Sequence, residues 1–154
     1  MFVNSLFAKF LKPVDTLLFF GDIGSGKTFF VRGTIQKMMK SQGILVEEVP
    51  SPTFTIIQVY DSLSPPVWHL DLYRLSDPDE IIELSMDDIL ETGICFIEWP
   101  EKMGFFLPKR NISITFDYLA KDYYNRKISI EFNGSDWEHI LNAFSTIEEL
   151  KCIF

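Results

Sequence analysis

Short apolar runs and helical segments alternate along the first part of the chain. Residues 16–21 (TLLFFG) form a compact apolar run that ends in glycine, which is typical of a buried strand. Residues 27–40 are predicted as a helix, with lysines near the C-terminal end, where a helix favours positive charge. Residues 4–11 (NSLFAKFL) have the pattern of a shorter amphipathic helix.

Further strands are predicted in the middle of the chain. Residues 44–49 (ILVEEV) and 53–60 (TFTIIQVY) are short runs rich in residues that favour strands. Residues 67–73 (VWHLDLY) alternate, so that His69 and Asp71 lie on one face of a strand and leucines on the other. The region therefore predicts consecutive strands with few residues between them.

Two more signals follow in the same region. A helix is predicted to start at Asp77, because Asp77, Pro78 and Glu80 fit a cap, a first helical position and a capping box. Residues 93–99 (GICFIEW) repeat the apolar strand pattern and end beside an acidic residue.

The end of the chain predicts an antiparallel hairpin over residues 111–118 and 126–132, followed by a helix over residues 135–144. Strands and helices therefore interleave, and the predicted fold class is α/β. A length of 154 residues favours a single domain that spans residues 1–154.

The composition excludes several classes of protein. Apolar residues make up 47% of the chain, which excludes a disordered tail, and no apolar run approaches the ~20 residues that span a bilayer. The net charge of −8 argues against a chain that grips nucleic acid alone, because phosphate contacts need Lys and Arg. Neither Cys95 nor Cys152 sits in a CxxC pair, so a reducing cytoplasm is expected.

The sequence GDIGSGKT, residues 21–28, matches the phosphate-loop pattern G-x-x-x-x-G-K-[ST] in full. Glycines let consecutive backbone N–H groups point at phosphate oxygens, and the helix that follows adds its positive N-terminal end. Lys27 is expected to reach the β- and γ-phosphates, and Thr28 to offer a hydroxyl to Mg²⁺. The position between a strand and a helix favours a nucleotide site over an ordinary glycine-rich turn. The predicted nucleotide-binding residues of this segment are Gly24, Ser25, Gly26, Lys27, Thr28 and Phe29.

A second magnesium ligand is expected at the carboxyl end of a neighbouring buried strand. Glu98 follows the apolar run ICFI, and we assign it to the metal, directly or through water. Asp71 ends a less apolar run and is the better choice for polarising the attacking water. For either carboxylate alone, a solvated residue at a strand end is the alternative interpretation.

The turn SPT, residues 51–53, precedes the Asp71 strand and has two interpretations. Pro52 biases Ser51 toward extended backbone and stiffens the turn. Thr53 could then present its hydroxyl to the γ-phosphate or Mg²⁺, as GTPase switch loops do. Equally, Ser51 and Thr53 could satisfy local backbone groups in a strand-entry turn. Spacing alone leaves both interpretations open.

Two features that the sequence lacks indicate which nucleotide binds. The chain has no N-K-x-D motif of the kind that reads guanine, and its arginines are too widely spaced for the phosphate-clamping lid of a small-molecule kinase. ATP is therefore expected, with Trp99 either flanking its base or packing at a strand end. A P-loop small-molecule or nucleoside kinase is the alternative function, and a nucleotide sensor without hydrolysis is a third.

The segments GDIGSGKTFFVRG, SPTFTIIQVY, HLDLYRLSDPDE and ICFIEWPEKMG occur in this order. Together they resemble the bacterial TsaE (YjeE) family of ATPases, over about residues 17–132. The resemblance implies a P-loop NTPase fold with a mixed, mostly parallel central sheet flanked by helices. It also implies a slow ATP hydrolase that uses ATP and Mg²⁺ and supports N6-threonylcarbamoyladenosine modification at position 37 of tRNA.

The resemblance further implies partners for this chain. In the family, a TsaB–TsaD heterodimer binds the ATPase, and TsaD transfers the threonylcarbamoyl group. ATP hydrolysis supports repeated turnover of that complex rather than the transfer. TsaB-like and TsaD-like partners are therefore expected, with tRNA reached only through them and no membrane involved. By motif position, the implied roles are phosphate and metal binding for Lys27 and Thr28, metal binding for Glu98, hydrolysis for Thr53 and Asp71, and nucleotide contact for Trp99 and Arg126.

Two features of the sequence differ from the usual family pattern, and a third concerns its charge. The segment before the phosphate loop is shorter than in typical members, which carry a Thr near the nucleotide base there. Ser85 stands where Gly is common in the family. Residues 77–91 contain many acidic residues and no basic one, which indicates either a solvated helix face or a docking face for a basic partner.

Overall fold

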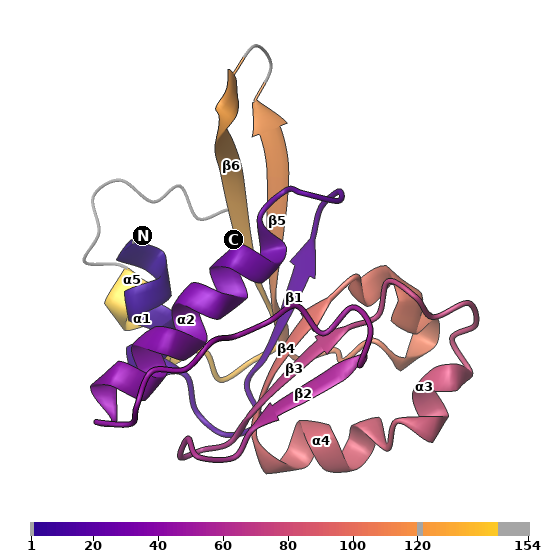
Figure 1. The fold of residues 1–154 in the computed structure, drawn as a ribbon, viewed down its shortest axis with the longest axis horizontal. Coiled ribbons are helices and arrows are strands. Elements are labelled where there is room, and N and C mark those ends of the chain that lie inside the picture. The colour runs from indigo at the N-terminus through magenta and orange to yellow at the C-terminus, as the bar shows by residue number, and fades with distance from the viewer. Residues whose placement is uncertain (1, 120–121, 145–154) are drawn as a thin grey trace.

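A six-stranded β-sheet forms the centre of the computed structural model, which describes residues 2–119 and 122–144 (Figure 1). Cys152 lies outside the described residues. The strands are β1 (Thr16–Phe20), β2 (Ile57–Tyr60), β3 (Val67–Asp71), β4 (Ile94–Glu98), β5 (Asn111–Leu119) and β6 (Asp122–Asn133). Their order across the sheet is β2-β3-β4-β1-β5-β6.

The strands in the middle of the sheet run parallel, whereas both outer strands are antiparallel to their neighbours. Parallel pairs join β3 to β4, β4 to β1 and β1 to β5. Antiparallel pairs join β2 to β3 and β5 to β6. The apolar runs of β1 and β4 lie side by side inside the sheet, as expected for strands buried on both faces. The prediction of a mixed, mostly parallel sheet is confirmed.

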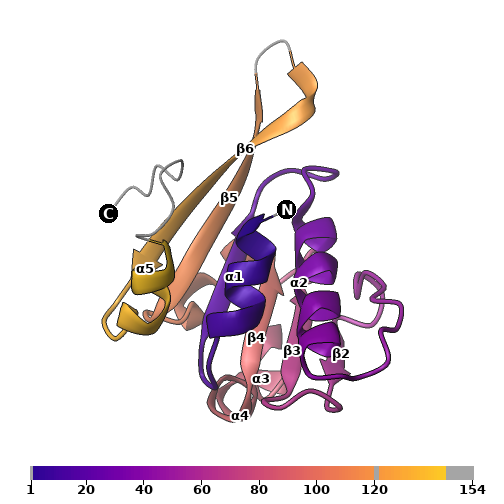
Figure 2. The same cartoon turned by 90° about the vertical axis from the view of Figure 1, so that its left-hand side faces the viewer.

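Helices cover both faces of the sheet (Figures 1 and 2). The helices are α1 (Phe2–Phe10), α2 (Lys27–Ser41), α3 (Glu80–Glu83), α4 (Met86–Thr92), a 3₁₀ segment η1 (Pro100–Phe106) and α5 (Glu138–Phe144). The helices α1 and α2 pack together on one face, and α5 contacts α1. The short helices α3 and α4 lie on the opposite face. The predicted α/β class is confirmed.

The alternation of side chains along the strands divides the apolar core in two. Phe19 of β1 points to the face covered by α1 and α2, where its ring contacts those of Phe30 and Phe116. Leu18, one residue earlier, belongs to the cluster under α3 and α4, together with Leu70. Because successive side chains of a strand point to opposite faces, one apolar run supplies both layers.

The predicted strand over residues 44–49 is wrong, because this segment forms no strand. Leu45 is 87% exposed and Val46 is 47% exposed, whereas Val49 is buried. The segment runs beside α2 instead, where Arg32 donates from Nε to the carbonyl of Val49 at 2.8 Å. The strand prediction failed because it rested on apolar composition, whereas Leu45 and Val46 are exposed.

Two predicted boundaries also shift. The strand expected over residues 53–60 begins only at Ile57, because the residues before it form a turn in which Ile56 has a φ of 65°. The helix expected from Asp77 begins at Glu80. The predicted capping contact between Asp77 and Glu80 is nevertheless present, because Oε1 of Glu80 accepts from the backbone N–H of Asp77 at 2.9 Å.

The β5–β6 hairpin is longer than the other strands and extends past the body of the molecule (Figure 2). It joins the sheet through the parallel β1–β5 pair. Within the described part of the chain, no helix is long and apolar enough to cross a membrane.

Candidate nucleotide site

The predicted phosphate loop connects the end of β1 to the start of α2. Gly21 has a φ of 136°, and a Cβ there would lie 2.7 Å from the carbonyl oxygen of Phe116. Gly26 has a φ of 111° and precedes the first residue of α2. Glycine is therefore required at both ends of the loop, once for close approach and once for a left-handed backbone. The loop closes directly onto the positive end of a helix, as anion binding needs.

Lys27 lies almost fully buried at the centre of the site. Its Nζ donates to the carbonyl oxygens of Gly21 and Asp22, at 2.5 and 2.9 Å. Nζ also lies 3.9 Å from the ring centroid of Trp99, a cation–π distance. Burial lowers the pKa of Lys27 below its usual value, and the neighbouring carboxylates of Glu98 and Asp71 act in the opposite direction. A phosphate in this site would supply the negative charge that a buried ammonium lacks.

Thr28 and Glu98 meet across the site from different elements. Oγ1 of Thr28, in the first turn of α2, donates to Oε2 of Glu98 at the end of β4, at 2.9 Å. Both groups are oxygen ligands of the kind that Mg²⁺ prefers. The sequence prediction that these two residues share a site agrees with this geometry.

Glu98 has a second contact on its other oxygen. Oε1 of Glu98 lies 2.9 Å from Nε2 of His69, a fully buried residue of β3. His69 was not among the predicted site residues. Its place on the same strand face as Asp71 was visible from the alternation of β3, and that position was the signal available in the sequence.

Asp71 ends β3 directly beside Glu98, because these two residues are partners in the parallel β3–β4 register. Its Oδ2 accepts from Oγ1 of Thr53 at 2.5 Å and faces Oγ of Ser51 at 3.5 Å. Its Oδ1 accepts from the backbone N–H of Tyr73 at 3.0 Å. The hydroxyls of the 51–53 turn therefore point to a carboxylate of the site.

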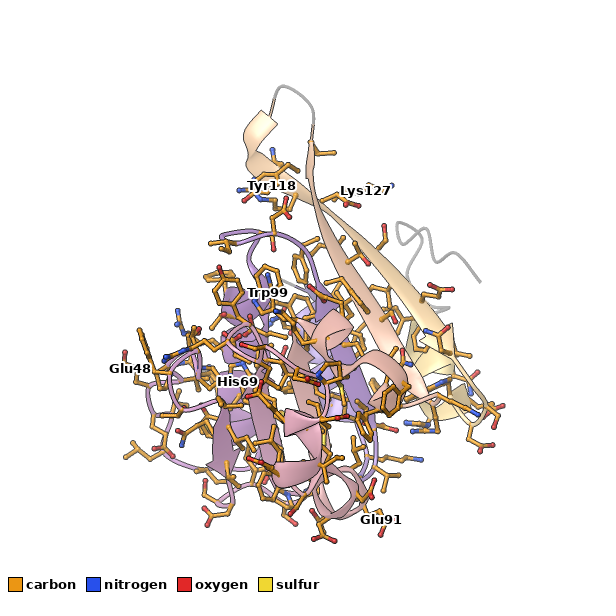
Figure 3. The ribbon with its side chains drawn as sticks, turned by 90° about the vertical axis from the view of Figure 1, so that its right-hand side faces the viewer. Glu48, His69, Glu91, Trp99, Tyr118 and Lys127 are labelled. Atoms are coloured by element: carbon orange, nitrogen blue, oxygen red, sulfur yellow. The ribbon has the colours of Figure 1, made fainter. Side chains whose placement is uncertain are left out.

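A pocket of about 420 Å³ opens between the phosphate loop, the 51–53 turn and the ends of β3 and β4. Of the predicted site residues, all but Arg126 line this pocket. Tyr73 and Trp99 form one wall, with ring centroids 4.9 Å apart. Trp99 directly follows β4, on the side of the body that faces the hairpin (Figure 3). Tyr73 was not among the predicted site residues.

Arg126 lines a second hollow, of about 370 Å³, on the other side of the phosphate loop. Gly24 and Phe29 line both spaces, so the two hollows share the loop. The guanidinium carbon of Arg126 lies 4.1 Å from the ring centroid of Tyr118, whose hydroxyl donates to the carbonyl of Ile23 at 3.1 Å. The hairpin thus places aromatic and cationic groups next to the loop, where a nucleotide base is expected.

The residues present fit a nucleotide with a divalent cation. Oγ of Ser25, inside the loop, is buried without a hydrogen-bond partner among the described residues. Within the same described ranges, no three His, Cys, Asp or Glu side chains gather into a metal site of their own. Thr28 and Glu98 would hold such a cation, and water and phosphate oxygens would supply its remaining ligands.

A phosphate loop between a buried strand and a helix, with acidic residues at the ends of adjacent parallel strands, defines a P-loop α/β protein of the nucleotide-binding class. Residues 2–128 match the model of the family described as threonylcarbamoyl adenosine biosynthesis protein TsaE. The chain therefore belongs to the TsaE family.

Similar proteins agree with this membership. The tRNA threonylcarbamoyladenosine biosynthesis protein TsaE of Rickettsia felis is 37% identical over 131 residues, covering 85% of this chain and 73% of the relative. The protein of the same name from Bacillus subtilis is 33% identical over 150 residues, covering 97% and 89%. The crystal structure of Bacillus subtilis YdiB superposes with a TM-score of 0.69 at 29% identity, covering 94% of this chain and 85% of that one.

Proposed function

We propose that this chain is an ATPase that binds ATP with Mg²⁺ and supports threonylcarbamoyladenosine modification at position 37 of tRNA. The observation that carries the proposal is the convergence of Lys27, the Thr28–Glu98 pair and the Thr53–Asp71 pair on one pocket. Family membership supports the tRNA pathway, since relatives at 31–37% identity carry that pathway in their names.

In the proposed site, Lys27 exchanges its contacts with the loop carbonyls for the β- and γ-phosphates. Thr28 and Glu98 hold Mg²⁺, which supplies charge neutralisation at the phosphates when bound. Asp71 orients the attacking water and accepts hydrogen bonding from it, and Thr53 contributes its hydroxyl near the terminal phosphate. Trp99 borders the nucleotide, and Phe29 and Arg126 lie on the side of the base.

Partners of the TsaB and TsaD type are part of the proposal. The net charge of −8 supports a role in which another protein holds the tRNA, because a lone tRNA binder would need a basic surface. The buried position of Cys95, whose pKa burial raises to about 12, is compatible with a reducing cytoplasm, where we place the reaction. We also propose that residues 1–154 act as one domain.

The test is reconstitution of the modification with a TsaB–TsaD complex, tRNA and threonylcarbamoyl-adenylate, with and without this chain. We expect many modified tRNAs per complex when the chain and ATP are present and few when the chain carries Lys27→Ala. Phosphate release should rise when the partner complex is added. Transfer of the γ-phosphate to a nucleoside or another small molecule, instead of release as inorganic phosphate, would support the kinase alternative and overturn the proposal.

A further inference from the structure

The imidazole of His69 lies fully buried in β3, at the interior position marked in Figure 3. It shares a strand face with Asp71, two residues later, and its register partner on β4 is Phe96. A buried polar ring costs free energy unless it is hydrogen bonded. An apolar side chain would fill the same space without that cost, so the hydrogen bond of His69 needs a reason.

Glu98 is the residue to which that hydrogen bond is made. Nε2 of His69 lies 2.9 Å from Oε1 of Glu98. A carboxylate only accepts hydrogen bonds, so Nε2 carries the proton and donates it. Nδ1 is buried and has no hydrogen-bond partner among the described residues. The polar contact of this ring within the described structure is therefore directed at Glu98.

The two oxygens of Glu98 consequently have different surroundings. Oε1 is held by His69, and Oε2 accepts from Oγ1 of Thr28 at 2.9 Å. A glutamate side chain has several rotatable bonds, and a donor on each oxygen fixes its orientation. Oε2 therefore faces the hydroxyl of Thr28, in the first turn of α2 beside the phosphate loop.

We propose that His69 is a positioning residue for the divalent cation of this site. By donating to Oε1 it holds Glu98 with Oε2 facing Thr28, so that the cation meets an oriented carboxylate. The inference rests on the proposed function, in which Thr28 and Glu98 hold Mg²⁺. Hydrogen bonds from residues that contact the metal ligands, but not the metal, orient those ligands in this way, and their loss typically weakens metal binding about 10–100-fold.

The test measures Mn²⁺ binding by electron paramagnetic resonance, with the protein saturated by a non-hydrolysable ATP analogue. His69→Leu removes the donor, and we expect Mn²⁺ affinity to fall about 10–100-fold. Affinity for the analogue without metal should stay unchanged, because His69 does not line the pocket. His69→Gln places an amide N–H at a similar reach and should restore most of the Mn²⁺ affinity.

Leu70→Val is the matched control. Leu70 is equally buried in β3 but belongs to the cluster on the other face of the sheet, so its shortening should leave Mn²⁺ affinity at the parent value. Parent affinity in His69→Leu would overturn the inference. Equal loss in His69→Leu and His69→Gln would also overturn it, because the loss would then not depend on the hydrogen-bond donor. If the parent protein and its analogue complex bind no Mn²⁺, the proposed metal site itself is wrong.

A second measurement needs no change at His69. The chain has two histidines, so His139→Gln leaves His69 as the remaining one. We expect nitrogen-15 NMR of the ring to show a proton on Nε2. The Nε2 proton signal should shift when Mg²⁺ is added to the analogue complex. An Nε2 that carries no proton, or an Nε2 proton signal that does not change when Mg²⁺ is added, would overturn the inference.

Discussion

Thr53 donates from Oγ1 to Oδ2 of Asp71 over 2.5 Å, so the two residues proposed for hydrolysis are in direct contact. The other oxygen of Asp71 accepts from the backbone N–H of Tyr73. Both oxygens of the carboxylate are therefore engaged within the protein. Asp71 can accept from an attacking water at Oδ2 only as a further partner or after Thr53 turns away from it, which would link the turn to the proposed hydrolysis.

Thr53→Val tests this link, because valine keeps the shape of threonine and removes the hydroxyl. We expect ATP hydrolysis to fall about 100-fold, the effect of losing one donor to a developing charge. Thr53→Ser keeps the hydroxyl and should stay close to the parent rate. Single-turnover phosphate release distinguishes the two variants. If Thr53→Val hydrolyses as fast as Thr53→Ser, the hydroxyl has no part in the reaction.

Asp71→Asn keeps the size of the side chain and removes its charge. We expect nucleotide affinity to persist, because Lys27 and the loop bind the phosphates in the proposed site. Hydrolysis should fall about 10²–10⁴-fold, the usual contribution of a positioned general base. Calorimetry and phosphate release, measured on the same sample, separate the two quantities. Hydrolysis at the parent rate would show that the role assigned to Asp71 is wrong.

Lys27→Met should abolish useful nucleotide binding and still stabilise the nucleotide-free protein. The pKa of Lys27 lies below its usual 10.5 because of burial, so folding with this ammonium protonated carries a penalty at neutral pH. Methionine has no charge to bury. We expect the Tm at pH 7 to rise above that of the parent protein.

The same pKa predicts the pH dependence of this gain. As pH rises from the lowered pKa of folded Lys27 toward 10.5, the folded protein loses the proton before the unfolded chain does. Parent stability therefore rises with pH over that interval, and the advantage of Lys27→Met should shrink. Thermal unfolding of both proteins at pH 7 and pH 10 measures the difference. An advantage that grows with pH would contradict burial of the ammonium as its cause.

Ser85→Gly should stabilise the protein. Ser85 is exposed, has a φ of 52° and a ψ of 45°, and precedes α4. A residue with a Cβ is disfavoured in this left-handed conformation, whereas glycine is not. We expect a gain of about 0.5–1 kcal/mol in the free energy of unfolding, after the greater freedom of glycine in the unfolded chain is subtracted. Urea denaturation measures it, and Ser85→Ala, which keeps a Cβ, should show no gain.

Much of the fold could be predicted from the sequence because strong local patterns coincide with burial. The apolar runs of β1 and β4 are buried in the sheet, and the loop between β1 and α2 has its glycines where the backbone requires them. At these positions one physical requirement, either burial or a backbone conformation that only glycine adopts easily, determines the residue type.

Contacts between distant segments could not be predicted in the same way. Residues 44–49 have the composition of a strand, but they run beside α2, where Arg32 donates to the carbonyl of Val49, and β2 stays the edge strand of the sheet. The hydrogen bond from His69 to Glu98 depends on the β3–β4 register, which no local pattern specifies. Likewise, neither interpretation of the Thr53 hydroxyl included its contact with Asp71, which depends on where β3 ends.

The position of Trp99 should make the fluorescence of the protein sensitive to nucleotide binding. Of the three tryptophans, Trp99 lines the nucleotide pocket, and Trp68 and Trp137 do not. Its indole ring lies 3.9 Å from the ammonium nitrogen of Lys27, so a phosphate that draws Lys27 away changes the electric field at the ring. The emission of this indole should therefore change with occupancy. The protein carries its own optical reporter, which can follow the filling and emptying of the site in real time without a dye.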